Sequence, residues 1–516
     1  MAPSVRDSAT ARPQGRPDTA GGRDQGSRSG PAARARRSAE RESLSDRRFP
    51  PGFVFGVATS AFQIEGATQE DGRGTSIWDT FARTPGSVIS GELGDPACDH
   101  YHRWEQDLDL MGWIGVNAYR FSLSWPRWQP TGRGRIESRG AAFYDRLVDG
   151  LLERDIQPWA TLYHWDLPQA LEDAGGWGER DTAYRFADYA RAVRETLGDR
   201  LTGLITLNEP WCSAMLGYAC GHHAPGMADK HVAVRSIHHL LLAHGLAASE
   251  WVKESPVPVG ITLNLYPVAA VSQDAADLDA ARRVDGLMNR MYLDPVLRGA
   301  YPGDVLADLG EFWDDALVRD DDLDRISTPL NFLGVNYYSS HLVAAVPGAS
   351  ADESPGGVAA VVAGTPARYS PWVGSPDVDF VSRGLPQTDM EWEIEPDGLR
   401  RMLTRLADDY ECPPVYITEN GAAFPDELAS GEVADTDRVE FLDGHLSSLL
   451  EAVQQGVDVR GYFLWSLLDN FEWAWGTTKR FGLIHVDFAT QARTPKASAH
   501  WYQSVIKSKS LPPQKA

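Results

Sequence analysis

Short runs of apolar residues alternate with longer amphipathic segments along most of the chain. Apolar runs without a polar face are typical of strands that are buried on both sides, as in a parallel sheet. The segments between them show helical spacing; within Thr182–Leu197, for example, Phe186, Tyr189, Ala190 and Val193 share one face with Leu197. The pattern predicts eight strands: Val54–Ala58, Ala118–Ser122, Gln157–Tyr163, Gly203–Asn208, Val257–Leu265, Phe332–Tyr337, Pro414–Glu419 and Gly461–Ser466.

Eight repeats of strand and helix favour an α/β fold, a single (β/α)₈ TIM barrel with long loops at the C-terminal face of the strands. No linker or internal repeat divides residues 49–505, so we predict that they form one barrel domain, followed by a C-terminal tail at 506–516. The Gly-, Pro- and Ser-rich stretch Val346–Pro376 is predicted to be a long loop after the sixth strand, of the kind that shapes a binding site.

Residues 1–48 have a different composition. They hold eleven Arg, six acidic residues and no aromatic residue, so we predict an Arg-rich disordered leader that cannot bury enough apolar surface to fold. The segment lacks the apolar stretch of a secretion signal. A basic arm that contacts an acidic partner, or the chain's own acidic body, is the functional alternative. A dispensable leader or an over-extended start is the simpler interpretation.

Two of the predicted strands run into a glutamate where they end. Leu204–Asn208 is followed by Glu209 and Pro210, and proline cannot continue a strand ladder. The second run ends at Glu419, shortly before Gly421. Because α/β barrels hold their chemistry at the C-terminal ends of the strands, this pattern predicts a pair of carboxyl groups facing one cleft. For either glutamate alone, a structural role beside an arginine is an equally good interpretation.

The other predicted strand ends and the loops after them add side chains that bind hydroxyl groups and flat apolar faces. Amides, an imidazole, carboxyls and indoles on one rim suit a sugar site, because the polar groups bind hydroxyls and the aromatic rings pack on the sugar. The side chains are Gln63, Arg120, His164, Trp165, Asn208, Asn336, Tyr338, Trp465, Glu472 and Trp473.

Composition excludes several other functions. A formal net charge of −23 disfavours nucleic acid and anionic membranes as partners. The chain has no phosphate-binding glycine motif, no Gly-x-Ser-x-Gly motif and no apolar run long enough to span a membrane. The four cysteines show no Cys-x-x-Cys pair, which indicates free thiols and a cytoplasmic location, although Cys212 and Cys220 are close enough in sequence to approach each other.

No metal or other cofactor is expected. The histidine pairs at 222–223 and 238–239 lack the further ligands that would complete a metal site. The acidic run Arg319-Asp-Asp-Asp322 lacks the pattern of a calcium loop and is predicted to be a solvated turn.

Two motifs resemble those of a known family. Thr206-Leu-Asn-Glu-Pro210 and Ile417-Thr-Glu-Asn-Gly421 are similar to the acid/base and nucleophile signatures of glycoside hydrolase family 1, the β-glucosidase family, and the resemblance extends from about Phe49 to Tyr502. It implies retaining hydrolysis of terminal non-reducing β-D-glucosyl residues of small β-glycosides or cello-oligosaccharides, with β-galactosides and β-fucosides also accepted. It further implies that Glu419 is the nucleophile of a double displacement and that Glu209 is the acid/base.

The resemblance also implies roles for the neighbouring residues. Arg120 and Tyr338 would support the nucleophile, and Asn208 would bind the sugar 2-hydroxyl. Glycoside hydrolases of this kind need no cofactor, but a transglycosylase and a non-catalytic sugar-binding barrel remain alternatives. The implied glycone pocket contains Gln63, His164, Trp165, Asn336, Trp465, Glu472, Trp473 and Phe481. Trp211, Leu216 and Tyr266 would border the aglycone entrance, where core packing is the alternative interpretation.

The sequence departs from the family pattern at two loop positions. Members often have glycine where Glu391 stands and an aromatic residue where Thr477 stands. Both departures leave the aglycone preference open.

Overall fold

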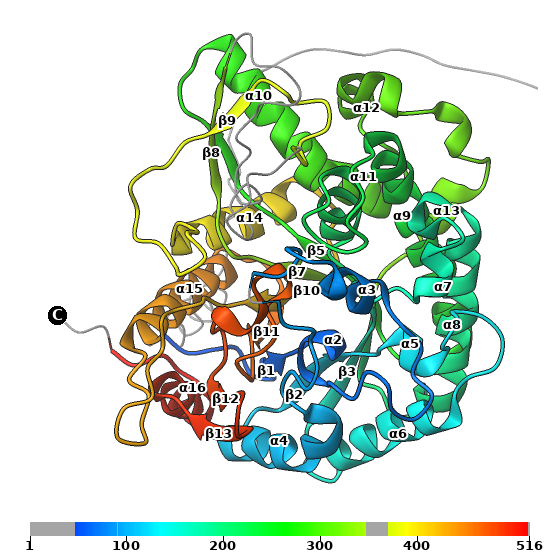
Figure 1. The fold of residues 1–516 in the computed structure, drawn as a ribbon. Helices are drawn as coiled ribbons and strands as arrows, with labels where there is room; N and C mark the ends of the chain where they lie inside the picture. Colours follow the sequence, from blue (N-terminus) through cyan, green and yellow to red (C-terminus); the bar gives the residue numbers. More distant parts are fainter. Residues whose placement is uncertain (1–46, 90, 347–369, 514–516) are drawn as a thin grey trace, which may run out of the picture. The chain divides into compact units, whose positions relative to one another are not determined.

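The computed structural model describes residues 47–89, 91–346 and 370–513. Within them, eight parallel strands close into a barrel in the order β1-β11-β10-β7-β5-β4-β3-β2. Figure 1 shows the strands at the centre and the helices around them, which confirms the predicted (β/α)₈ fold. The barrel strands are β1 (Val54–Ala58), β2 (Ala118–Ser122), β3 (Gln157–Tyr163), β4 (Gly203–Asn208), β5 (Val259–Asn264), β7 (Phe332–Asn336), β10 (Val415–Asn420) and β11 (Val459–Trp465).

Helices cover the outside of the barrel. The predicted helix at 182–197 is confirmed as α8, and the residues predicted for its inner face are all buried. The longer helices are α4 (His100–Ile114), α6 (Ser138–Leu152), α8 (Asp181–Leu197), α9 (Lys230–Glu254), α10 (Ala275–Asp285), α11 (Met291–Arg298), α14 (Pro396–Asp409), α15 (Thr436–Gln454) and α16 (Ala497–Ser508). The shorter ones are α2 (Ala61–Ile64), α3 (Ile77–Arg83), α5 (Trp125–Trp128), α7 (Gln169–Glu172), α12 (Gly303–Leu309) and α13 (Asp322–Ile326), with a π-helical turn η2 (Cys212–Ala219) and a 3₁₀ turn η6 (Trp473–Thr478).

The predicted strand limits agree with the structure to within two residues. β5 starts at Val259 instead of Val257, because Pro258 has no N–H to donate to a neighbouring strand. β10 ends at Asn420, directly before Gly421. A Cβ atom at Gly421 would lie 1.7 Å from the carbonyl oxygen of Trp465, so only glycine fits where β10 passes the end of β11.

Aromatic side chains fill the barrel near the amino ends of its strands. The ring of Trp159 lies 5.2 Å from Phe332, 4.8 Å from Tyr416 and 5.4 Å from Phe463, between ring centres. All but Tyr416 are almost fully buried. The barrel interior below the C-terminal rim is therefore a packed core, as is usual in this fold.

Two small sheets lie outside the barrel: β6 (Val268–Ala270), β8 (His341–Ala345) and β9 (Val378–Phe380) form one, and β12 (Ile484–Asp487) with β13 (Ala492–Pro495) the other. β8 and β9 extend beside α10 at the top of Figure 1. Most of the predicted loop Val346–Pro376 lies outside the described residues. Its two ends are joined, because Val346 N–H donates to the carbonyl of Asp377 and β8 pairs with β9.

The barrel unit extends beyond the predicted limits of 49 and 505. Arg47 donates to Asp443 and Ser447 on α15, and Arg48 pairs with Ser510. α16 continues to Ser508, and Leu511 is buried. Residues 1–46, and with them most of the predicted leader, lie outside the described residues.

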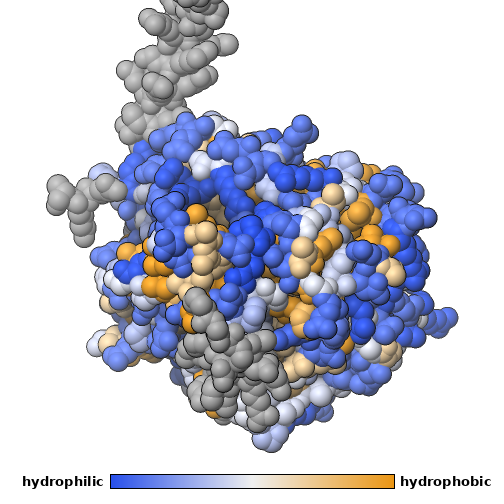
Figure 2. Space-filling model, turned by 90° about the horizontal axis from the view of Figure 1, so that it is seen from above, coloured by the Kyte–Doolittle hydropathy of each residue, from blue (hydrophilic) through white to orange (hydrophobic). Residues whose placement is uncertain are grey.

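The face of the molecule seen in Figure 2 is mainly hydrophilic, with hydrophobic residues in small separate patches. In the described part of the chain, no helix is both long and apolar enough to cross a membrane.

Candidate active site

Two glutamates lie at the C-terminal ends of opposite parts of the sheet, as predicted. Glu209 follows β4 directly, and Glu419 is the last residue but one of β10. Their side chains are nearly inaccessible, with residue exposures of 5% and 3%. Glu209 has φ +47°, a left-handed conformation that turns the chain sharply where the strand ends.

Glu419 is surrounded by hydrogen-bond donors that compensate a negative charge. Arg120, in the middle of β2 and fully buried, forms an ion pair with one carboxyl oxygen. The Tyr338 hydroxyl donates to the other at 2.7 Å. Arg120 also donates to Asn208 Oδ1 at 2.6 Å, which fixes the guanidinium between the two strand ends. A buried carboxylate with a paired guanidinium and a hydroxyl donor is suited to remain charged in a dry site.

Glu209 has a different environment. It accepts hydrogen bonds from Asn336 Nδ2 at 2.6 Å and from the Cys212 thiol at 3.1 Å, and no cation contacts it within the described residues. Burial, followed by the nearby charge of Glu419, raises the pKa of Glu209 to about 8. A proton is therefore held on Glu209 at neutral pH, next to a charged Glu419.

An amide and imidazole layer connects the two glutamates. Asn208 Oδ1 accepts from Asn336 Nδ2 at 3.1 Å, and its amide lies 3.0 Å from His164 Nε2. Trp165 Nε1 donates to the backbone carbonyl of Asn208 at 3.0 Å. Burial and, secondly, the positive charge of Arg120 hold the pKa of His164 well below its usual value, so its imidazole is neutral.

A third carboxyl group lies in the same cavity. Glu472 accepts from Gln63 Nε2 at 3.2 Å, and burial together with the charge of Glu419 raises the pKa of Glu472 to about 8. The sequence predicts that Glu472 binds sugar hydroxyls. Because its carboxyl group is protonated at neutral pH, it can also donate a hydrogen bond to a hydroxyl oxygen. Trp473, the next residue, has φ +51°, and Trp165 has φ +77°. Residues other than glycine with such left-handed φ values cluster at functional sites, where the surrounding packing holds them.

These side chains surround one cavity of about 950 Å³. The predicted residues that line it are His164, Trp165, Glu209, Trp211, Leu216, Tyr266, Tyr338, Glu419, Trp465, Glu472, Trp473 and Phe481. Gln63, Arg120, Asn208 and Asn336 lie one layer behind and are hydrogen-bonded to the lining or to each other.

The sequence interpretation missed part of the lining. Cys212 follows Glu209 by three residues and belongs to η2, so the direction of its side chain was not evident from strand periodicity. Trp372 comes from the predicted long loop and stacks near Trp211, with ring centres 5.3 Å apart. The full set that was missed is Cys212, His223, Asn264, Met288, His341, Trp372, Met390, Trp392 and Trp475.

The remaining candidate groups have structural roles. His238 bonds Asp322 and Tyr301, and His239 bonds the carbonyl of Trp177. Asp322 is 1% exposed, so the prediction of a solvated turn is wrong for this residue. All four cysteines are free thiols. Among the described residues, no three His, Cys, Asp or Glu side chains gather as a metal site would require.

A TIM barrel whose rim holds two buried carboxyl groups in an aromatic cavity has the architecture of a glycoside hydrolase site. Comparisons with known proteins agree: residues 45–511 match the family model of glycosyl hydrolase family 1. The chain therefore belongs to glycosyl hydrolase family 1.

Its relatives are well matched over their whole length. β-Glucosidase A of Thermotoga maritima is 45% identical over 473 residues, which cover 91% of this chain and 100% of that protein. A bifunctional β-D-glucosidase/β-D-fucosidase of Bifidobacterium breve is 47% identical over 469 residues, covering 89% and 98%. The crystal structure of a psychrophilic β-glucosidase from Micrococcus antarcticus is 49% identical, with a TM-score of 0.86 over 90% of this chain and 99% of that one. The protein is thus a retaining β-glycosidase of the β-glucosidase type, acting through a covalent glycosyl-enzyme.

Proposed function

We propose that Glu419 is the nucleophile and Glu209 the acid/base in the hydrolysis of terminal non-reducing β-D-glucosyl residues. The contrast between the two carboxyl environments supports this assignment. Glu419 is paired with Arg120 and hydrogen-bonded by Tyr338, which suits an ionised nucleophile. Burial and the charge of Glu419 keep the pKa of Glu209 above neutrality, which suits a proton donor.

The two steps follow from these protonation states. In the first, Glu419 attacks the anomeric carbon as the glycosidic C–O bond breaks, and Glu209 gives its proton to the leaving oxygen. Esterification removes the charge of Glu419, which lowers the proton affinity of Glu209. In the second, Glu209 takes a proton from water, whose oxygen attacks the anomeric carbon and releases Glu419 as a carboxylate.

Residues of the lining and of the layer directly behind it would hold the sugar. Glu472 and Gln63 form a hydrogen-bonded pair that matches neighbouring hydroxyls, and Asn208 lies between Arg120 and His164, where the 2-hydroxyl would bind. We extend the proposal to β-galactosides and β-fucosides as slower substrates. Among β-glucosides, we propose small aryl glycosides and cello-oligosaccharides as substrates. A cytoplasmic location is part of the same proposal, supported by the four free thiols.

Azide rescue tests the assignment of Glu419. We expect Glu419→Gly to lose turnover of p-nitrophenyl β-glucoside by several orders of magnitude, because the covalent route is removed. Added azide should then give α-glucosyl azide, since the small anion attacks from the face that the carboxyl group occupied. Near-normal turnover by Glu419→Gly, or a β-configured azide, would contradict the assignment.

The wild-type enzyme separates the alternative functions. Following the product anomer by NMR should show β-glucose formed first. Absence of turnover on any aryl β-glycoside would indicate a sugar-binding barrel, and products that depend on an added acceptor sugar would indicate a transglycosylase.

A further inference from the structure

A second concavity borders the active-site cavity on the side of β8 and β9. This side groove has a volume of about 680 Å³. Its floor and walls come from residues 339–342, 380–382, 387 and 390–393. His341, Met390 and Trp392 line both the side groove and the active-site cavity, so the groove begins where the cavity wall ends.

The side chains of the groove match a neutral, hydroxyl-rich ligand. Trp392 and Met390 are half-buried and offer apolar surface at the shared boundary. Gln387 and Glu391 are exposed, and neither side chain makes a hydrogen bond or ion pair with another described residue. Arg383, which directly follows the groove residue Ser382, is paired with Glu393 and Glu395. The groove therefore offers amide and carboxyl groups together with an aromatic ring, the combination that binds sugars.

Glu391 stands in an unfavourable backbone conformation at the tip of a tight hairpin. Its φ is +62°, a left-handed value that glycine adopts at lower free energy than any residue with a Cβ atom. The hairpin is closed by hydrogen bonds between Thr388 and Trp392 and by the bridge between Gln387 and Glu393. Residues with a Cβ atom are held in this conformation by the surrounding structure, and such residues cluster at active sites and ligand-binding loops. The backbone N–H of Glu391 donates to the carbonyl of Thr388, but the Glu391 side chain makes no hydrogen bond or ion pair with another described residue that would account for this conformation.

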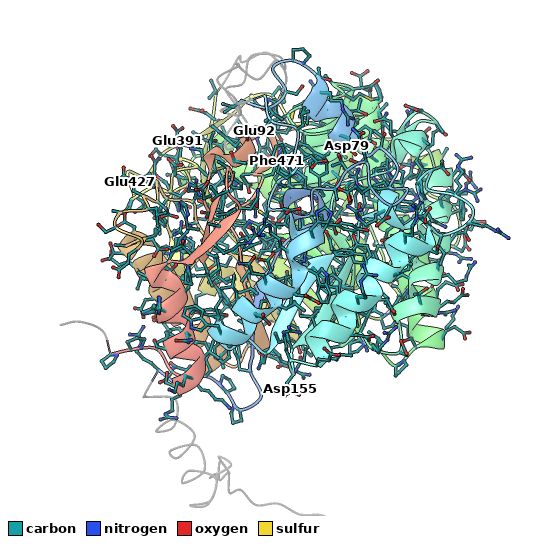
Figure 3. All side chains as sticks on the ribbon, turned by 60° about the horizontal axis from the view of Figure 1, so that its bottom comes forward. Asp79, Glu92, Asp155, Glu391, Glu427 and Phe471 are labelled. Atoms are coloured by element: carbon teal, nitrogen blue, oxygen red, sulfur yellow. The ribbon has the colours of Figure 1, made fainter. Side chains whose placement is uncertain are left out.

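Glu391 lies on the side of the barrel that holds the active site. Figure 3 shows it on the same side as Phe471, which is part of the loop after β11, and opposite Asp155, which precedes β3. Its carboxyl group is therefore at the rim where the aglycone leaves the active site.

We propose that Glu391 is a specificity-determining residue that binds the second sugar unit of an oligosaccharide aglycone in this side groove. The inference rests on the proposed function, since the first sugar of the aglycone must occupy the cavity next to Glu209. The aglycone chain passes over Trp392, and Glu391 accepts hydrogen bonds from hydroxyls of its second sugar. A p-nitrophenyl aglycone is too short to reach Glu391.

Chain-length kinetics with Glu391→Gly test this proposal. The ratio of kcat/KM for cellotriose to that for cellobiose should fall about tenfold or more relative to wild type, the size expected for a hydrogen bond to a charged group. Turnover of p-nitrophenyl β-glucoside should stay within twofold of wild type. Glu391→Gln should retain most of the ratio, because the amide oxygen still accepts a hydrogen bond.

Two further measurements keep the outcomes separate. Thermal unfolding should show Glu391→Gly at least as stable as wild type, because glycine relieves the backbone conformation; a clear loss of stability would mean that Glu391 serves the fold, and would overturn the proposal. Glu427→Gly is the matched control, an exposed loop glutamate outside the groove, and should leave the ratio unchanged. An unchanged ratio in Glu391→Gly overturns this inference alone, whereas failure of wild type on p-nitrophenyl β-glucoside would overturn the proposed function.

Discussion

At the scale of single residues, the proton on Glu209 controls the pH dependence of the enzyme. Because burial and Glu419 raise the pKa of Glu209 to about 8, the acid form is present below this pH and is lost as pH rises through it. We therefore expect kcat/KM to fall on the alkaline side with an apparent pKa near 8. In single-turnover measurements, Glu209→Gln should slow substrates with poor leaving groups far more than dinitrophenyl glucosides. Equal losses for both would argue against an acid role.

The Cys212 thiol adjusts the same equilibrium. Its S–H donates to Glu209, which favours the carboxylate form and lowers the pKa of Glu209 relative to a site without the thiol. Cys212→Ala should move the alkaline limb of kcat/KM to higher pH, and Cys212→Ser, with a stronger donor, should move it to lower pH. A limb that stays at one pH in both variants would show that the thiol only fills space.

Which residues could be predicted depended on where they stand in the sequence. Glu209, Asn208 and Glu419 follow apolar runs that end at proline or glycine, so their place on the rim was evident before the structure. Met390 and Trp392 come from a loop hairpin, and the sequence offered no periodicity that would point them into the cavity. The protonation of Glu472 was also beyond the sequence, because it depends on burial and on the distance to Glu419.

At the scale of elements, Asp322 joins three helices. It accepts hydrogen bonds from Arg180, just before α8, and from His238 on α9, and it opens α13. Burial alone would raise the pKa of Asp322, but the hydrogen bonds from His238 and Arg180 lower it far below its ordinary value. The carboxylate thus stabilises the folded state above its unfolded pKa of about 4, and this contribution is lost as pH falls below that value.

We expect Asp322→Ala to lower the free energy of unfolding by about 3–5 kcal/mol at pH 7, because it leaves Arg180 and His238 without their buried partner. Chemical denaturation of both proteins measures the difference, which should shrink in acid. Asp321→Ala is the control: Asp321 is exposed, pairs with Arg325 on the surface and should change stability by less than about 1 kcal/mol. Equal effects of the two substitutions would contradict the role given to Asp322.

Elements could be predicted where a local run of residues shows the periodicity. The predictions failed where the residues that pack together are far apart in the sequence. The eight barrel strands and α8 follow from runs of five to seventeen residues. The run at 319–322 has the composition of a solvated turn, and nothing near it in sequence reveals Arg180, which is 142 residues away from Asp322. The three-stranded sheet of β6, β8 and β9 was missed for the same reason, since its strands are short and half-exposed.

At the scale of the whole molecule, electrostatics oppose anionic substrates. The chain carries a formal net charge of −23, and the cavity lining holds Glu419 together with Glu209 and Glu472, which are protonated at neutral pH and would lose their protons above about pH 8. No lysine or arginine belongs to the lining in the described part of the chain, and burial lowers the pKa of the lining histidines His223 and His341 to about 3. Lys479 and Arg480 directly precede the lining residue Phe481, and both are already paired, Lys479 with Asp389 and Arg480 with Asp469.

We therefore expect p-nitrophenyl β-glucoside 6-phosphate to be hydrolysed with a kcat/KM about 10³-fold or more below that of the unphosphorylated glucoside. The phosphate would bring about two negative charges towards the ion-paired Glu419 in a cavity that salt screens poorly, beside a Glu472 that is protonated at neutral pH, so the difference should persist at high ionic strength. The 6-O-methyl glucoside is the matched control, since it removes the 6-hydroxyl donor without adding charge, and it should be affected much less. Comparable rates for phosphorylated and unphosphorylated substrates, or an equally slow 6-O-methyl glucoside, would show that charge does not determine this selectivity.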